Sequence, residues 1–119
     1  MTIYHKDLKH KFKNMNFLEQ MANVGSEVFR AISWQEKGNY NYALISFERA
    51  LELLDFTSEG IKDFHKLKEL RRLREVLVDY FAGDNIYKSS SKLWQNYFYG
   101  FNYAAALLRQ KNRPLIKNI

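Results

Sequence analysis

Apolar residues recur at steps of three and four along residues 17–54, with a single break at Gly38 and Asn39. Before the break they are Phe17, Leu18, Met21, Gly25, Val28, Phe29 and Ile32, and after it Tyr40, Ala43, Leu44, Phe47, Ala50, Leu51 and Leu54. This spacing predicts two helices. Gly38 suits the left-handed position after a helix, and Asn39 suits the cap of the next one. Because the link is so short, the helices are predicted to form an antiparallel hairpin.

The rest of the chain carries two further helical patterns. The polar stretch 55–60 is predicted to be a loop, followed by a third helix from about Ile61 to Ala82 and a fourth from about Lys92 to Gln110. Five glycines and one proline are too few for a β-sandwich or barrel rich in turns. The predicted fold class is therefore all-α, a four-helix up-down bundle with a tight N-terminal helical hairpin.

The net charge of +6 is concentrated at the two ends of the chain. Residues 1–14 carry +3 and residues 109–119 carry +4, whereas residues 15–108 sum to −1. We predict a basic N-terminal tail over 1–14, one helical domain over 15–110 and a basic C-terminal tail over 111–119. Each tail is either simply solvated or a contact for phosphates or an acidic partner.

The sequence excludes most catalytic chemistry. With no cysteine, it has neither thiol catalysis nor thiolate metal sites. Asp63 and His65 are two residues apart and so face different sides of a helix, which gives no metal site. Ser89–Ser91 have no nearby histidine, and no glycine-rich phosphate loop is present. We predict no enzyme activity, cofactor or metal. No run of 18 apolar residues or signal peptide is found, which predicts a cytoplasmic protein without a membrane partner.

Aromatic residues cluster in the fourth predicted helix. Trp94, Tyr97, Phe98, Tyr99, Phe101 and Tyr103 lie within ten residues, and their directions spread around the helix. One face can pack the core, while the others belong either to a centrally buried helix, to half-exposed tyrosines, or to an interface. The interface hypothesis predicts a homo-oligomer or a protein partner bound by Tyr87, Trp94, Tyr97, Tyr99 and Tyr103.

A second hypothesis is contact with nucleic acid. Aromatic rings beside a basic groove form a stacking platform for single strands, and basic residues follow the aromatic cluster closely. The predicted contacts are Lys68, Arg72, Arg109, Lys111 and Arg113, and RNA is the possible ligand.

The first hairpin resembles half of a tetratricopeptide repeat over residues 37–54. Gly38 closes the first helix, Ala43 and Ala50 let two helices approach, and Phe47 fills the space between them. A shift of 34 residues lands on Leu77, Phe81 and Asp84, which does not continue the pattern. Because such a repeat needs about three copies to bury its faces, a solenoid is not predicted.

The same hairpin also resembles the HEPN family of small helical bundles. Gly38, Tyr40 and Ala43 match its Gly-x-Tyr-x-x-Ala turn, and Ala50 and Glu52 match the helix beyond. Members of this family are metal-independent ribonucleases or silent partners of small nucleotidyltransferases. The ribonucleases carry an Arg followed a few residues later by a His, and this chain lacks that pair, since Arg49 is the nearest arginine before His65. The resemblance implies a non-catalytic accessory domain associated with RNA or nucleotides.

Overall fold

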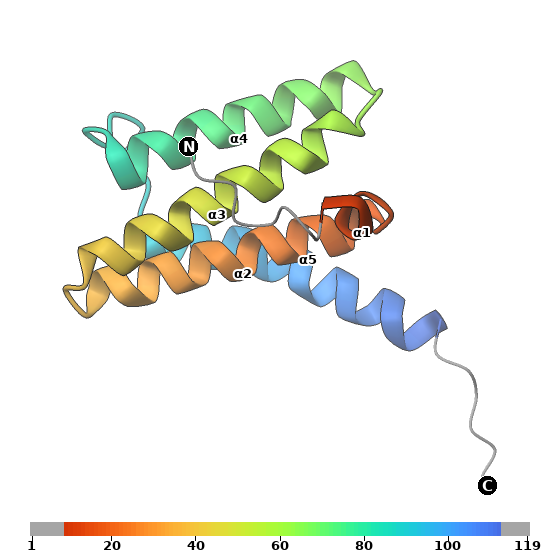
Figure 1. The fold of residues 1–119 in the computed structure, drawn as a ribbon, viewed down its shortest axis with the longest axis horizontal. Helices are drawn as coiled ribbons and strands as arrows, with labels where there is room; N and C mark the ends of the chain where they lie inside the picture. The colour runs from red at the N-terminus through yellow and green to blue at the C-terminus, as the bar shows by residue number, and fades with distance from the viewer. Residues whose placement is uncertain (1–8, 113–119) are drawn as a thin grey trace, which may run out of the picture.

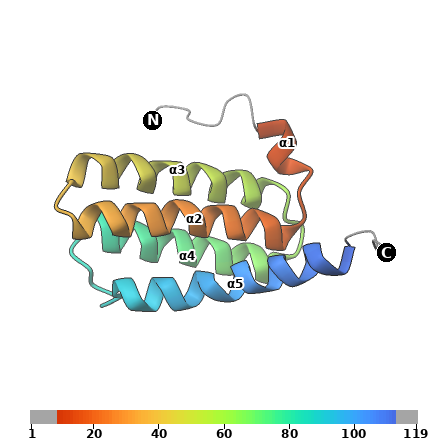
Figure 2. The ribbon, with the colours of Figure 1, turned by 90° about the horizontal axis from the view of Figure 1, so that it is seen from below.

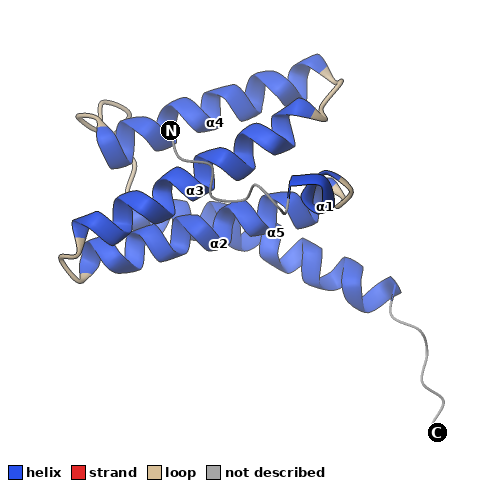
Figure 3. Ribbon diagram, in the orientation of Figure 1, coloured by secondary structure: helices blue, strands red, loops and turns tan. Residues whose placement is uncertain are grey.

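The computed structural model describes residues 9–112, and this part of the chain consists of five helices joined by short connections (Figure 3). The all-α prediction is confirmed. The helices are α1 (Lys9–Lys13), α2 (Phe17–Glu36), α3 (Tyr40–Glu59), α4 (Phe64–Ala82) and α5 (Ser91–Asn112).

Helix α2 occupies the centre of the arrangement. It packs most extensively against α3 on one side and α5 on the other, whereas α4 packs mainly against α3 (Figures 1 and 2). The chain turns back on itself at each connection between the long helices, so the α2–α3 and α4–α5 connections lie at the same end (Figure 1). The C-terminal part of α5 extends past the other helices.

The predicted hairpin and its caps are present between α2 and α3. Gly38 has φ +80°, the left-handed conformation that favours glycine. The side chain of Asn39 accepts a hydrogen bond from the Tyr42 N–H at 3.2 Å, and Asn16 does the same for the Glu19 N–H at 2.9 Å. These caps satisfy backbone donors that a helix leaves open at its start. They fix where both helices begin.

The prediction of a loop over residues 55–60 is wrong, because α3 continues to Glu59. Phe56 and Thr57 are buried in the core, and the Thr57 hydroxyl donates to the Leu53 carbonyl at 2.9 Å. A polar residue that bonds within its own helix therefore continues that helix here. The next helix starts at Phe64, since Asp63 accepts hydrogen bonds from two backbone N–H groups of its first turn.

The structure has five helices rather than the predicted four, because α1 forms in the region predicted as an N-terminal tail. Phe12 is 4% exposed and its ring lies 6.2 Å from that of Phe56. At the end of α3, Glu59 contacts Lys13 at 2.6 Å, and this ammonium lowers the pKa of the Glu59 carboxyl. A helix of five residues is too short to show periodicity, which is why the sequence pattern missed it.

Helices α2 and α5 approach each other closely in the core, where Gly25 meets Phe98. A Cβ built on Gly25 would lie 2.8 Å from the Cβ of Phe98, so the missing side chain lets the two helices approach. Phe98 is fully buried there. The other large apolar side chains that are fully buried are Met21, Val24, Val28, Ile32, Leu54 and Leu77.

Helix α4 is tied to α3 by an ion pair as well as by packing. The Arg74 guanidinium donates to both carboxylate oxygens of Asp55, at 2.8 Å from Nε and 3.3 Å from Nη2. This two-point geometry fixes the orientation of both groups. Leu70, Leu73 and Leu77 supply the buried face of α4.

Candidate protein interface

Helix α5 exposes large apolar side chains along most of its length. Helix α5 packs against α2 by one face. Its sequence places apolar residues on other faces as well, so this packing cannot cover all of them. The exposed fractions are 51% for Leu93, 42% for Tyr97, 65% for Tyr99, 57% for Tyr103 and 48% for Leu107. Apolar surface gathered in this way on one element is typical of an interaction site.

Three of the four predicted interface tyrosines lie on this helix. Tyr99 and Tyr103 stack on each other, with ring centroids 6.4 Å apart and planes 17° apart. Tyr97 instead leans against the core, with its ring 5.0 Å from that of Phe98. Burial of its phenol, reinforced by the charge of Glu69, raises the pKa of Tyr97 above its ordinary value. Each of the three tyrosines therefore has an aromatic neighbour on the same helix.

Trp94 is in a different environment from the tyrosines. It is 2% exposed, and its ring lies 6.2 Å from that of Phe98, nearly parallel to it. The ring of Tyr80 of α4 lies 6.4 Å from that of Trp94. Trp94 thus packs in the core, and in this structure it presents almost no surface to a partner. It falls on the buried stripe with Phe98 and Ala105.

The fifth predicted residue, Tyr87, lies on the connection between α4 and α5. The Asp79 carboxylate accepts hydrogen bonds from the backbone N–H groups of Ile86 at 2.8 Å and Tyr87 at 3.0 Å. The Tyr87 hydroxyl donates to Glu75 at 3.2 Å, and this carboxylate raises the pKa of Tyr87. These bonds hold the connection in one shape, with Ile86 76% exposed.

We expect Asp79→Ala to loosen this connection. The two backbone donors at Ile86 and Tyr87 lose their acceptor, which lowers the free energy of unfolding by about 1 kcal/mol because water replaces it only in part. The measurement is urea unfolding together with amide hydrogen exchange at both residues. Asp79→Asn, which keeps one acceptor oxygen, serves as the control and should fall between the two proteins. Unchanged exchange at Ile86 in Asp79→Ala would contradict the expectation.

Sequence reasoning missed three exposed residues of this surface, namely Ile86, Leu93 and Leu107. For the two leucines the sequence did carry a signal of exposure, because both positions fall outside the apolar stripe of α5 that packs against α2. Ile86 had no such signal. It belongs to a connection, and its exposure follows from the hydrogen bonds that Asp79 makes across seven and eight residues.

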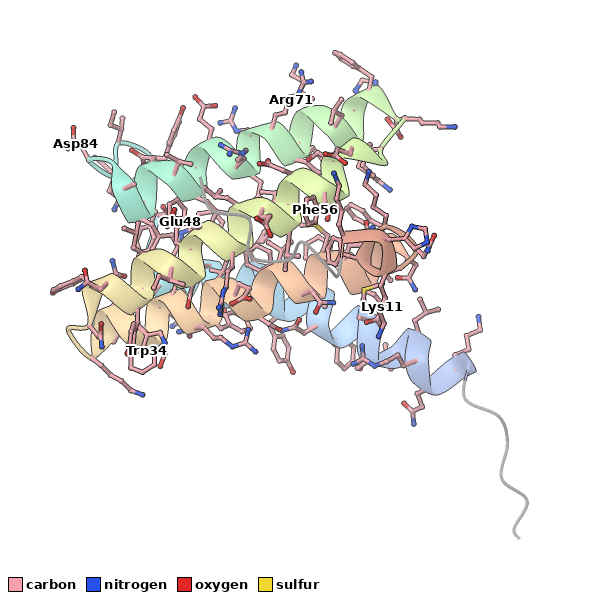
Figure 4. The ribbon with its side chains drawn as sticks, in the orientation of Figure 1. Lys11, Trp34, Glu48, Phe56, Arg71 and Asp84 are labelled. Carbon is pink, nitrogen blue, oxygen red and sulfur yellow. The ribbon has the colours of Figure 1, made fainter. Side chains whose placement is uncertain are left out.

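The predicted nucleic-acid contacts are divided between two helices. Lys68 and Arg72 are exposed on α4, together with Arg71, which points outward in Figure 4. Lys111 is exposed near the end of α5, whereas Arg109 makes an ion pair with Glu19 of α2 at 2.6 Å. Arg113 lies outside the described residues. The structure thus places one basic face on α4 and separate cations at the end of α5.

A cavity of about 280 Å³ lies away from all these residues, where α1 meets α2 and α3. Arg30 and Glu27 pair across its wall at 3.0 Å. Its lining residues are Lys11, Phe12, Met15, Asn23, Ser26, Glu27, Arg30 and Leu53. Within residues 9–112 no group of three or more histidines and carboxylates is placed to hold a metal ion. In the same part of the chain, every helix is too short or too polar to cross a membrane.

Comparison with known proteins identifies no relative of this chain. Searches against protein-family models, curated proteins and solved structures find no match to this chain.

Proposed function

We propose that this chain is a non-enzymatic, cytoplasmic helical module that binds protein through α5, either a second copy of itself or another chain. In this proposal the four long helices act as an up-down bundle that presents α5 at its surface. The observation that carries it is the row of exposed tyrosines and leucines on a helix whose opposite face is buried. Tyr97, Tyr99 and Tyr103 are the residues we expect to contact the partner.

The chemistry of these side chains supports binding rather than simple exposure. Tyrosine offers a large apolar ring with few rotatable bonds, so little conformational freedom is lost when a partner covers it. The Tyr99 and Tyr103 rings are already ordered against each other. Covering preordered apolar surface is favourable at roughly 25 cal/mol per Å². Contact between this surface and another protein is therefore favourable in free energy.

Sedimentation velocity on the full chain tests the proposal. We expect the mean mass to rise above 14.3 kDa with concentration, and the double variant Tyr99→Ala/Tyr103→Ala to raise the dissociation constant at least tenfold, roughly 1.4 kcal/mol. Tyr40→Ala/Tyr42→Ala is the matched control, since these tyrosines are equally exposed on α3. If both double variants behave alike, α5 is not the binding surface. If the chain is strictly monomeric, the proposed partner is a different protein and not a second copy of the chain.

A second candidate function is an accessory domain of HEPN type that contacts RNA without cleaving it. The exposure of Lys68, Arg71 and Arg72 on one face of α4 favours it, since three cations within five residues suit a phosphate backbone. Retention on RNA that falls with salt is the expected result. Lys68→Ala/Arg72→Ala should then reduce the salt dependence of RNA retention. An unchanged salt dependence would exclude this face of α4 as the RNA contact.

A further inference from the structure

Four of the five large exposed apolar residues of α5 are arranged symmetrically about Gly100, the exception being Tyr99. Leu93 and Leu107 lie seven residues before and after it, and Tyr97 and Tyr103 lie three residues before and after it. All four side chains are among the large exposed apolar groups of the protein. Read in either direction, the face presents leucine, tyrosine, glycine, tyrosine and leucine in the same order. We call these five residues the Gly100 face.

Helix geometry places the Gly100 face on one side of α5. With about 100° of rotation per residue, the two leucines point within roughly 20° of the direction of Gly100 and the two tyrosines within roughly 60°. The buried residues Trp94 and Phe98 point to the other side, towards the core. The symmetry of the sequence is thus a symmetry of one accessible surface.

Within residues 9–112 of a single copy, no packing contact accounts for a glycine at position 100. A glycine in the middle of a helix destabilises it by about 1 kcal/mol relative to alanine. At Gly25 the reason is visible, because Phe98 occupies the space of the missing side chain. Around Gly100 a built Cβ meets no atom within 4 Å. Its lack of a side chain would, however, let a second helix approach closely at the centre of the exposed face.

The charges of α5 also allow the face to meet a copy of itself. The charged residues of this helix are Lys92, Arg109 and Lys111, so the span from Leu93 to Leu108 is uncharged. In an antiparallel pair centred on Gly100, that span lies against itself without charge, and like charges approach only at the two ends of the pair, where Lys92 comes near the other copy's Arg109 and Lys111 and Glu19 already pairs with Arg109. The interface of a twofold dimer must be complementary to itself, and an apolar face that reads the same in both directions meets this condition.

We propose that two copies of this chain pair through the Gly100 face as an antiparallel twofold dimer. Gly100 of one copy lies against Gly100 of the other, and Leu93 of each copy packs against the other's Leu107. The end of one α5 then approaches the other copy's α4–α5 connection, where Ile86 is exposed and held by Asp79. This inference rests on the proposed function and specifies its partner.

Cysteine cross-linking tests the geometry directly, because the natural chain contains no cysteine. In the proposed dimer, Gly100→Cys places two thiols beside the twofold axis, within the 7 Å that a disulfide allows between Cα atoms. Leu93→Cys alone leaves its two copies about 21 Å apart along the helix, whereas Leu93→Cys/Leu107→Cys brings unlike positions together. We expect oxidation to give a covalent dimer for Gly100→Cys and for the double variant.

Gln95→Cys is the matched control, because Gln95 is exposed on the opposite side of the same helix. It should cross-link at least tenfold more slowly than Gly100→Cys. The double variant keeps Gly100, so it tests the pairing even if a side chain at position 100 separates the helices. Fast cross-linking of Leu93→Cys alone would show a parallel pair and overturn the proposal, as would equal rates for Gly100→Cys and Gln95→Cys. In both of those cases, association that still depends on Tyr99 and Tyr103 would leave the proposed function standing.

Discussion

Replacing Phe98 by alanine is expected to lower the free energy of unfolding by about 3–5 kcal/mol. Phe98 is fully buried and its ring contacts those of Trp94, Tyr97 and Phe101 at centroid distances of 5.0 to 6.4 Å. Removing it leaves a cavity where α5 meets α2, and these rigid rings have little freedom to fill it. The effect approaches the total stability of a typical domain of this size.

Chemical denaturation followed by circular dichroism measures this loss. Tyr99→Ala is the control, because Tyr99 is the next residue on the same helix and is 65% exposed. In the monomer it should change the free energy of unfolding by only a few tenths of a kcal/mol. Equal losses for Phe98→Ala and Tyr99→Ala would mean that α5 does not pack on α2 through Phe98.

Gly25→Val is expected to lower the free energy of unfolding by about 3 kcal/mol or more. This is the second largest effect that we expect. A Cβ at this position would lie 2.8 Å from the Cβ of Phe98 and 2.9 Å from its Cδ1, closer than atoms of this kind approach. Either α5 moves away from α2 or the Phe98 ring leaves its rotamer, and both responses lose packing. Gly60→Ala is the control, since the nearest atom to its built Cβ is 3.8 Å away.

A double-mutant cycle separates this clash from a general effect of the glycine. Gly25→Ala alone introduces the clash, whereas Gly25→Ala/Phe98→Ala removes the contacts with Cδ1 and Cγ of residue 98, at 2.9 and 3.0 Å, and keeps only the contact with its Cβ, which can relax towards the space that the ring leaves. We therefore expect the double variant to lose less free energy of unfolding than the two single variants together, by at least about 1 kcal/mol. Additive losses would show that Gly25 and Phe98 are not in contact.

The parts of the fold that depend on local pattern were predictable from the sequence. The turn at Gly38 and the cap at Asn39 follow from residue types at fixed positions, and both are present. The end of α3 was not predictable in this way, because Thr57 looks like a loop residue until its hydroxyl is seen to bond within its own helix. Likewise, Phe12 marks α1 only through its packing against Phe56, a contact across 44 residues.

The candidate site shows a similar division. The clustering of Tyr97, Tyr99 and Tyr103 is visible in the sequence, and the structure places all three at the surface. The helical spacing of Trp94 with Phe98 and Ala105 is the sequence signal that separates it from them, and the direction in which α2 packs decides that this stripe is covered. The shape of the connection at Ile86 depends on Asp79 of the preceding helix, and such distant side-chain bonds have no local pattern.

The contact between Gly25 and Phe98 also has a consequence for synthesis on the ribosome. The two residues are 73 positions apart, and α3 and α4 lie between them in the chain. Chains emerge and begin to fold from the N-terminus, so α2 and α3 can pair as soon as their hairpin is complete. The apolar face of α2 that Phe98 covers stays exposed until α5 has been translated. Throughout that interval, the nascent chain exposes apolar surface, which makes it prone to aggregation.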